Sequence, residues 1–135
     1  MEHLSSCKHK FEKAICLIRS GLDDIIERNP CECTCDVKHG ICCIEKGIKE
    51  TEEGIICIET HVGEFFREEI ARFSIAIAKI GVALCLEGIR AFKNCDVDRG
   101  VRLTELGLFL LEIVLRILRE HEIESDCDCG CEGIA

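Results

Sequence analysis

Cysteine is the residue type through which this chain can do chemistry, since thirteen of its 135 residues are Cys. Six of them stand in two similar segments, each with three thiols on alternate residues and carboxylates beside them. These six are Cys31, Cys33, Cys35, Cys127, Cys129 and Cys131. Thiolates bind soft metal ions, and thiols also join in disulfides. The two segments therefore predict a thiol-based function, through either metal or disulfides.

Metal binding is the first interpretation. Cys31, Cys33 and Cys35 are followed by His39, and these four ligand types suit a tetrahedral Cu(I) or Zn(II) site. The Cys-x-x-Cys pair that is typical of zinc sites does not occur in the sequence, however. A cytosolic protein that binds or stores Cu(I) or Zn is therefore the alternative prediction.

Disulfide cross-linking is the interpretation that we favour, and it requires no cofactor. Neighbouring thiols in Cys-x-Cys are poorly placed to bond to each other, so each is expected to find a partner elsewhere. The odd number of cysteines leaves at least one thiol for a metal, another chain or the free state. Further thiols available for the same chemistry are Cys7, Cys42, Cys43, Cys57 and Cys95.

Apolar residues at helical spacing predict an all-α fold, an up-down bundle of about four helices. The helices are expected at about 6–28, 37–60, 64–93 and 98–122, within a bundle domain of residues 1–126 that is followed by a cysteine-rich tail, 127–135. Asn29-Pro30 ends the first helix. A break is expected near Gly63, where the apolar phase slips by one residue, and Asp36 and either Asp96 or Asp98 are suited to cap the second and fourth helices.

The largest apolar residues at this spacing are expected to face inward. They are Phe11, Ile15, Ile18, Leu22 and Ile25 in the first helix; Ile41, Ile44, Ile48, Thr51, Ile55, Ile58 and Val62 in the second; Phe66, Ile70, Phe73, Ile77, Ile80 and Leu84 in the third; and Leu103, Leu106, Leu110, Ile113 and Ile117 in the fourth. Gly40, Gly47 and Gly54 recur every seven residues. Glycine inside a helix costs about 1 kcal/mol relative to alanine, so this stripe predicts a close approach of helices.

Two stretches, 73–86 and 106–118, are more apolar than a solvated helix requires. Both are shorter than the roughly 20 residues of a membrane span, and charged residues interrupt them. They predict burial against other copies of the chain, and the alternative is a central helix in a well-packed monomer.

Charge and composition exclude several classes of function. The net charge of −9 argues against nucleic acid or an anionic membrane as a partner, because both require a basic surface. An enzyme is not expected either. A thiol enzyme needs a Cys-x-x-Cys motif at a helix start, or a cysteine beside a histidine and a third orienting group, and neither is visible. The first ten residues do not resemble a signal peptide, so synthesis in a reducing cytoplasm is expected.

In an up-down bundle, the two cysteine segments are expected at opposite ends, which suits connectors between molecules. With its helical body, Cys31-x-Cys33-x-Cys35, the tail Cys127-x-Cys129-x-Cys131 and no export signal, the chain resembles the cysteine-rich morphogenetic proteins of the clostridial exosporium. That resemblance implies synthesis in the mother-cell cytoplasm and a structural role at the spore surface. It also implies assembly with itself and with other cysteine-rich coat proteins, followed by cross-linking once the cell lyses.

Overall fold

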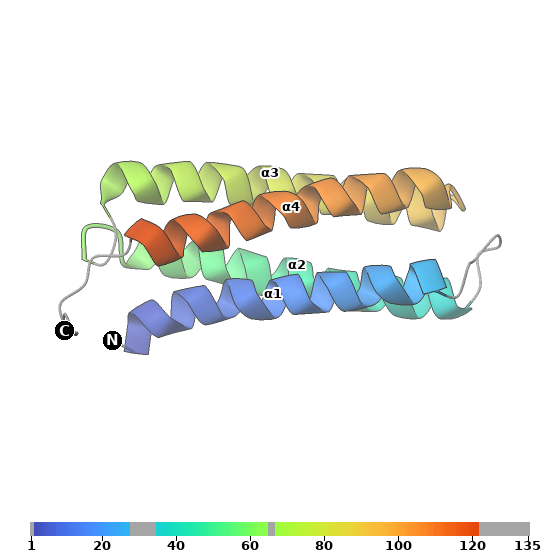
Figure 1. The fold of residues 1–135 in the computed structure, drawn as a ribbon, viewed down its shortest axis with the longest axis horizontal. Coiled ribbons are helices and arrows are strands. Elements are labelled where there is room, and N and C mark those ends of the chain that lie inside the picture. The colour runs from blue at the N-terminus through green and yellow to red at the C-terminus, as the bar shows by residue number, and fades with distance from the viewer. Residues whose placement is uncertain (1, 28–34, 65–66, 122–135) are drawn as a thin grey trace.

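The computed structural model describes residues 2–27, 35–64 and 67–121, with side chains from residue 7 onward in the first range and from residue 37 onward in the second. They form four helices: α1 (Glu2–Glu27), α2 (Cys35–Thr60), α3 (Glu68–Lys93) and α4 (Val97–His121). Figure 1 shows successive helices running in opposite directions. The predicted all-α, up-down bundle is therefore confirmed.

The helix ends follow the local sequence. Gly63 follows the end of α2 with a φ of 85°, a conformation in which glycine is not strained. The break predicted near Gly63 is thus present, although α3 begins only at Glu68. At α4 the Arg99 backbone N–H donates to Asp96 Oδ1 at 3.4 Å, so Asp96, not Asp98, is the N-cap. Asp36 lies inside the first turn of α2 and not before it.

The four helices form two hairpins, α1–α2 (the first hairpin) and α3–α4 (the second hairpin), and the helices of each hairpin almost touch. A Cβ atom added to Gly21 would lie 2.5 Å from the carbonyl oxygen of Gly40 on the facing helix. One added to Gly107 would lie 2.7 Å from the carbonyl oxygen of Gly81. Side chains at these positions would push the backbones apart, which confirms that the glycines allow a close approach.

The two hairpins are copies of one structural unit. A Cβ on Gly47 would meet Ile18 at 2.5 Å, and a Cβ on Gly107 would meet Cys85 at 2.6 Å. Gly40 with Ile25 and Gly100 with Phe92 repeat this correspondence, each at 2.5 Å. Residues of α4 therefore match those of α2 sixty positions earlier, and residues of α3 match those of α1 sixty-seven positions earlier.

The sequence retains traces of this duplication. Cys35-Asp36-Val37 recurs as Cys95-Asp96-Val97, and Gly40, Gly47 and His61 recur as Gly100, Gly107 and His121. The two offsets differ by the seven residues 28–34, which have no counterpart in the second hairpin and which contain Cys31 and Cys33. Two of the three thiols in the first cysteine segment are thus additions to the repeated unit, whereas Cys35 belongs to it.

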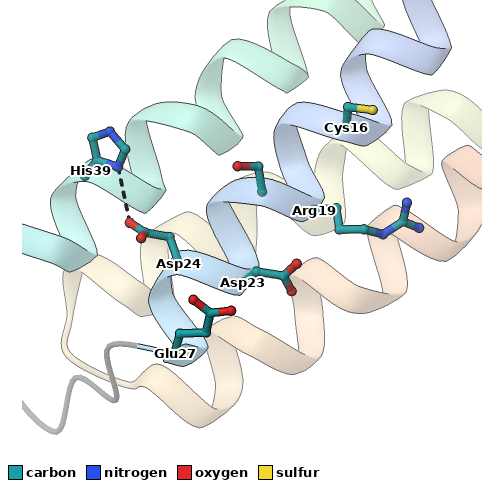
Figure 2. A pocket seen from close by; sticks show the side chains of 7 residues that line it. Cys16, Arg19, Asp23, Asp24, Glu27 and His39 are labelled. Carbon is teal, nitrogen blue, oxygen red and sulfur yellow. Dashed lines mark hydrogen bonds and ion pairs between the residues drawn. The ribbon is translucent and has the colours of Figure 1, made fainter.

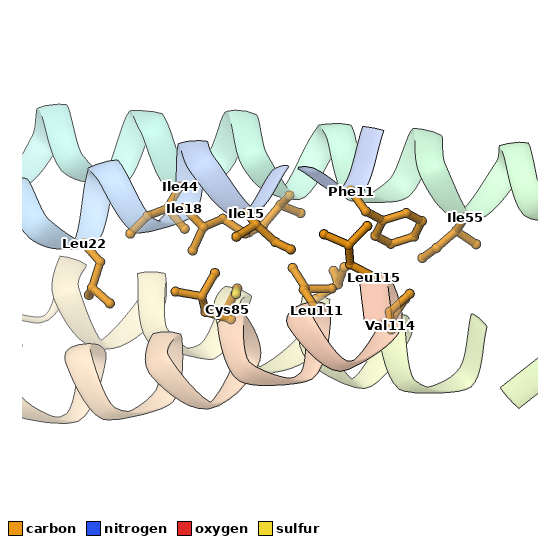
Figure 3. Packing of buried hydrophobic residues seen from close by; sticks show 14 of the residues in the cluster. Phe11, Ile15, Ile18, Leu22, Ile44, Ile55, Cys85, Leu111, Val114 and Leu115 are labelled. Atoms are coloured by element: carbon orange, nitrogen blue, oxygen red, sulfur yellow. The ribbon is translucent and has the colours of Figure 1, made fainter. Parts of the chain in front are cut away.

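A layer of large apolar side chains joins the two hairpins. Figure 3 shows Phe11, Ile15, Ile18 and Leu22 of α1 facing Leu111 and its neighbours on α4. The inward residues predicted for α1 are all buried, and so are those of α2 except Val62, which is 39% exposed. The sequence therefore predicted the inward face of the first hairpin correctly.

The inward faces predicted for α3 and α4 are wrong at three positions. The other described residues of these faces are only partly buried, and Phe66 lies outside the described residues. Phe73, Ile80 and Leu106 are more than half exposed. The buried residues of α3 are instead small or lie on another face: Ala71, Ser74, Ala78, Gly81, Val82, Cys85, Gly88, Ile89, Ala91 and Phe92. Those of α4 are Gly100, Thr104, Gly107, Leu108, Leu111, Val114, Leu115 and Leu118. The physical reason is the close approach of the helices, which admits only small side chains on the facing surfaces and leaves large ones outside.

None of the described helices is long and apolar enough to cross a membrane.

The close approach can be tested at Gly21. We expect Gly21→Ala to lower the free energy of unfolding by about 1–3 kcal/mol, because the new methyl group must displace the backbone at Gly40. Urea unfolding followed by circular dichroism measures the change. Ser20→Ala, at an exposed position one residue earlier, is the matched control and should change stability by less than about 0.5 kcal/mol. A Gly21→Ala variant more stable than the wild type, as helix propensity alone would give, would contradict the packing described here.

Candidate functional site: the thiols

The two cysteine segments begin where helices end, and these helix ends lie at opposite ends of the bundle. Glu27 and Cys35, which border the first segment, lie at one end, and His121, which precedes the second, lies at the other (Figure 1). Cys35 is the first residue of α2. The other five thiols of these segments lie outside the described residues: Cys31, Cys33, Cys127, Cys129 and Cys131.

Cys7 of α1 and Cys57 of α2 form a disulfide within the first hairpin. Their sulfurs are 2.11 Å apart and their Cα atoms 5.5 Å apart. Cys7 is fully buried. A disulfide that joins residues so far apart in sequence restricts the unfolded chain and typically contributes about 2–4 kcal/mol. The structure thus pairs two of the additional thiols with each other inside one chain.

His61 lies one helical turn after Cys57, and its ring completes a cluster with the two sulfurs. One ligand atom from each of Cys7, Cys57 and His61 lies within 4.8 Å of the others. The His61 Nδ1 atom is 2.9 Å from the Cys57 carbonyl oxygen. Because a carbonyl can only accept, Nδ1 carries the hydrogen and the ring lone pair is on Nε2, the arrangement found in metal-binding histidines.

This cluster can therefore exist in two chemical states. In the oxidised state the two sulfurs bond to each other. In the reduced state two thiolates and one imidazole are three ligands of the kind that Zn(II) and Cu(I) prefer, with a fourth position for water or another ligand. Tetrahedral zinc would hold the sulfurs about 3.8 Å apart, so metal binding requires the disulfide to open. The sequence signal was the Cys57-x-x-x-His61 spacing, which places both on one helix face, but Cys7 is too distant in sequence to have been linked with them.

Four described thiols are free, and they differ in accessibility. Cys16 of α1 and Cys42 of α2 are exposed, Cys43 is partly exposed and Cys85 is buried. Burial raises the pKa of the Cys85 thiol to about 12, so this thiol is inert at physiological pH. Cys95, in the turn between α3 and α4, is disulfide-bonded.

A shallow acidic hollow surrounds Cys16. It has a volume of about 440 Å³ and is lined by Cys16, Arg19, Ser20, Asp23, Asp24 and Glu27 of α1 and by His39 of α2. In Figure 2, His39, which was predicted as a metal ligand, points toward Asp24, with its Nδ1 3.2 Å from Asp24 Oδ2. His39 is thus paired with a carboxylate at the surface. The hollow leaves the Cys16 thiol accessible to another molecule.

Comparison with protein-family models, curated proteins and solved structures finds no match to this chain.

Accessibility predicts which thiols react. In the folded, unreduced protein we expect iodoacetamide to alkylate Cys16 and Cys42 at mildly alkaline pH. Cys85 should react at least roughly 100-fold more slowly, because burial disfavours its thiolate. Mass spectrometry of the labelled peptides measures these rates. Labelling in denaturant, where Cys85 should react like the others, is the control. Equal rates in the folded protein would contradict the burial of Cys85.

Proposed function

We propose that this protein is a structural component that assembles with itself and becomes cross-linked by disulfides into a spore-surface layer, in the exosporium or coat. The observation that carries the proposal is that the two cysteine segments attach at opposite ends of a rigid helical bundle. Thiols at both ends of a molecule can join neighbours head to tail, and contacts between different surfaces extend without closing.

The accessible thiols of the first hairpin support the same proposal. Cys16 and Cys42 are free and exposed on two different helices, so links can also form sideways. Each link forms when two thiols lose two protons and two electrons to an oxidant such as dioxygen. The thiols remain reduced in a cytoplasm and react after release from it, so synthesis in the cytoplasm is compatible with cross-linking at the cell or spore surface.

The apolar core lets the bundle keep its shape while links form around it. The core is made of Ile, Leu, Val, Phe and Ala side chains with two buried cysteines, Cys85, which is free, and Cys7, which is already joined to Cys57. The partners of this proposal are other copies of the chain and further cysteine-rich coat proteins. No catalytic step and no cofactor is part of it.

Cross-linking can be tested with purified protein that is reduced and then oxidised in air. We expect a ladder of multimers on non-reducing gels that collapses in dithiothreitol, and sheets or fibres in electron micrographs. Replacing Cys127, Cys129 and Cys131 with Ser should abolish the ordered assemblies without loss of helicity. Cys85→Ala is the control, since it removes a buried thiol and should leave the ladder unchanged. Oxidised wild-type protein that stays monomeric, with the thiols still titratable, would overturn the proposal.

Thiolate metal binding is the second candidate, and the cluster of Cys7, Cys57 and His61 favours it. Under this alternative the reduced protein takes up Zn(II) or Cu(I) in the cytoplasm, with release of the two thiol protons. The earlier ligand set of Cys31, Cys33, Cys35 and His39 remains a prediction, and of these only the side chain of His39 is described.

Metal titration of the reduced protein tests this candidate. If it is correct, Co(II) added under anaerobic conditions should give a thiolate charge-transfer band, and both Cys57→Ser and His61→Gln should lose one equivalent of it. His9→Gln, which changes an exposed histidine that belongs to neither ligand set, is the control. A wild-type protein that binds no metal after complete reduction, or a Cys57→Ser variant that binds as much as the wild type, would exclude the cluster.

A further inference from the structure

The outer face of the first hairpin, the side turned away from the second hairpin, is charged. Lys10 of α1 contacts Glu53 of α2 at 2.6 Å and Glu50 at 3.4 Å, and Lys13 lies 3.7 Å from Glu50. The hydrogen bond to Glu53 raises the pKa of Lys10, and the same bond lowers the pKa of Glu53. These ion pairs cross the α1–α2 contact on the solvent side, as expected for a surface that water covers.

The second hairpin carries apolar residues at the matching positions. The offset of sixty-seven places Ile77 and Ile80 of α3 where α1 has Lys10 and Lys13. The offset of sixty places Leu110 and Ile113 of α4 where α2 has Glu50 and Glu53. Lys46 and Lys49 likewise correspond to Leu106 and Phe109. An ion-pair network in one copy of the unit is thus an apolar surface in the other. We call this surface the apolar face, formed by Phe73, Ile77, Ile80, Leu84, Leu103, Leu106, Phe109, Leu110, Ile113 and Ile117.

The fold does not require this surface. The first hairpin makes the same glycine-mediated helix contact with Lys and Glu at these positions, so the packing of α3 on α4 does not depend on apolar side chains there. Four of its side chains are more than half exposed, Phe73 at 58%, Ile80 at 54%, Leu106 at 53% and Phe109 at 58%, and the other six are partly buried. A large exposed apolar patch of this kind marks an interaction site in a folded protein.

The dimensions of the apolar face suit a protein partner. On α4 it extends from Leu103 to Ile117, which is roughly 20 Å at the helical rise, and two packed helices are roughly 20 Å wide. The flat area is thus roughly 400 Å², about half of what each partner buries in a standard interface, and the polar residues around the face would supply the rest.

We propose that the apolar face binds the same face of a second copy of this chain, forming a two-fold dimer. Charge favours this partner over others. Residues 67–121 contain nine Lys and Arg against eight Asp and Glu, a net charge of +1, whereas the whole chain has −9. Two copies that meet through the second hairpin therefore avoid the repulsion between the acidic remainders of the chains, and a strongly basic or acidic partner has no net charge to recognise there.

The dimer leaves the free, exposed thiols of the first hairpin on its outer sides. With the second hairpins together at the centre, the first hairpins lie on the two outer sides, where Cys16 and Cys42 stay accessible. The inference rests on the proposed function only in taking a second copy as the partner, because the contact itself needs no thiol. Disulfides would then connect dimers that have already formed, so each dimer would add links in two directions.

Sedimentation equilibrium of the full chain in excess dithiothreitol tests the dimer separately from cross-linking. We expect the wild type to dimerise at micromolar concentration. The triple variant Ile80→Lys, Leu106→Lys and Phe109→Lys should dimerise roughly 100-fold more weakly or not at all. Each lysine is the residue found at the matching position of the first hairpin, so the variant should keep its helicity. Phe109→Lys alone is a milder variant that should weaken the dimer measurably.

The matched control is a second triple variant, Ile26→Lys, Ile56→Lys and Val62→Lys. It adds the same charge at exposed apolar residues outside the apolar face, which are 46%, 59% and 39% exposed. This control should dimerise as the wild type does. A wild type that is monomeric in dithiothreitol at all concentrations would overturn the proposal, and so would equal weakening by both triple variants. A dimer in dithiothreitol that forms no ladder on oxidation would instead overturn the disulfide cross-linking and leave the apolar face as the dimer interface.

Discussion

The close approach of the two helices in each hairpin is the constraint on which the rest of the structure depends. Between Gly21 and Gly40, and again between Gly81 and Gly107, there is no room for a Cβ atom. Glycine is a poor helix former, and each one costs about 1 kcal/mol relative to alanine in a helix interior. The chain tolerates this cost because the backbones of two helices without intervening side chains touch along several turns. The many dispersion contacts between them add up to a stabilising contribution. The result is two thin hairpins whose remaining apolar faces must be covered by something else.

The two hairpins meet this requirement differently. Each buries one face in the layer between them, where Phe11, Ile18 and Leu111 are fully buried. The first hairpin then covers the outer side of its helix contact with ion pairs such as Lys10–Glu53. Exposed ion pairs contribute little to stability, and their role here is to keep that surface in water. The second hairpin has no such pairs at the matching positions. The first hairpin therefore has a charged outer surface and the second an apolar one.

This difference also explains how far the sequence could predict the structure. The number of helices, the break near Gly63 and the inward face of α1 follow from apolar spacing, because α1 has one apolar face. Helix α3 has two apolar faces, one of small residues such as Ala78 and one of large residues such as Ile80. Spacing alone cannot rank them, and residue size favours the wrong one. The three-dimensional contact of the glycines decides between them, and it also reveals the repeat, whose two offsets make it hard to see in the sequence alone.

The candidate site was predictable in kind but not in detail. Thiol chemistry follows from composition, whereas the pairing of Cys7 with Cys57 depends on the antiparallel register of α1 and α2. Most of the described cysteines lie on the first hairpin, whereas the apolar face lies on the second. The buried Cys85 stands where α1 has Ile18, so it replaces an aliphatic side chain in the repeated unit and carries no reactive role. The apolar face thus lies on the second hairpin, whereas the free and exposed thiols Cys16 and Cys42 lie on the first. The proposed association through the apolar face would therefore leave these two thiols accessible for the proposed cross-linking.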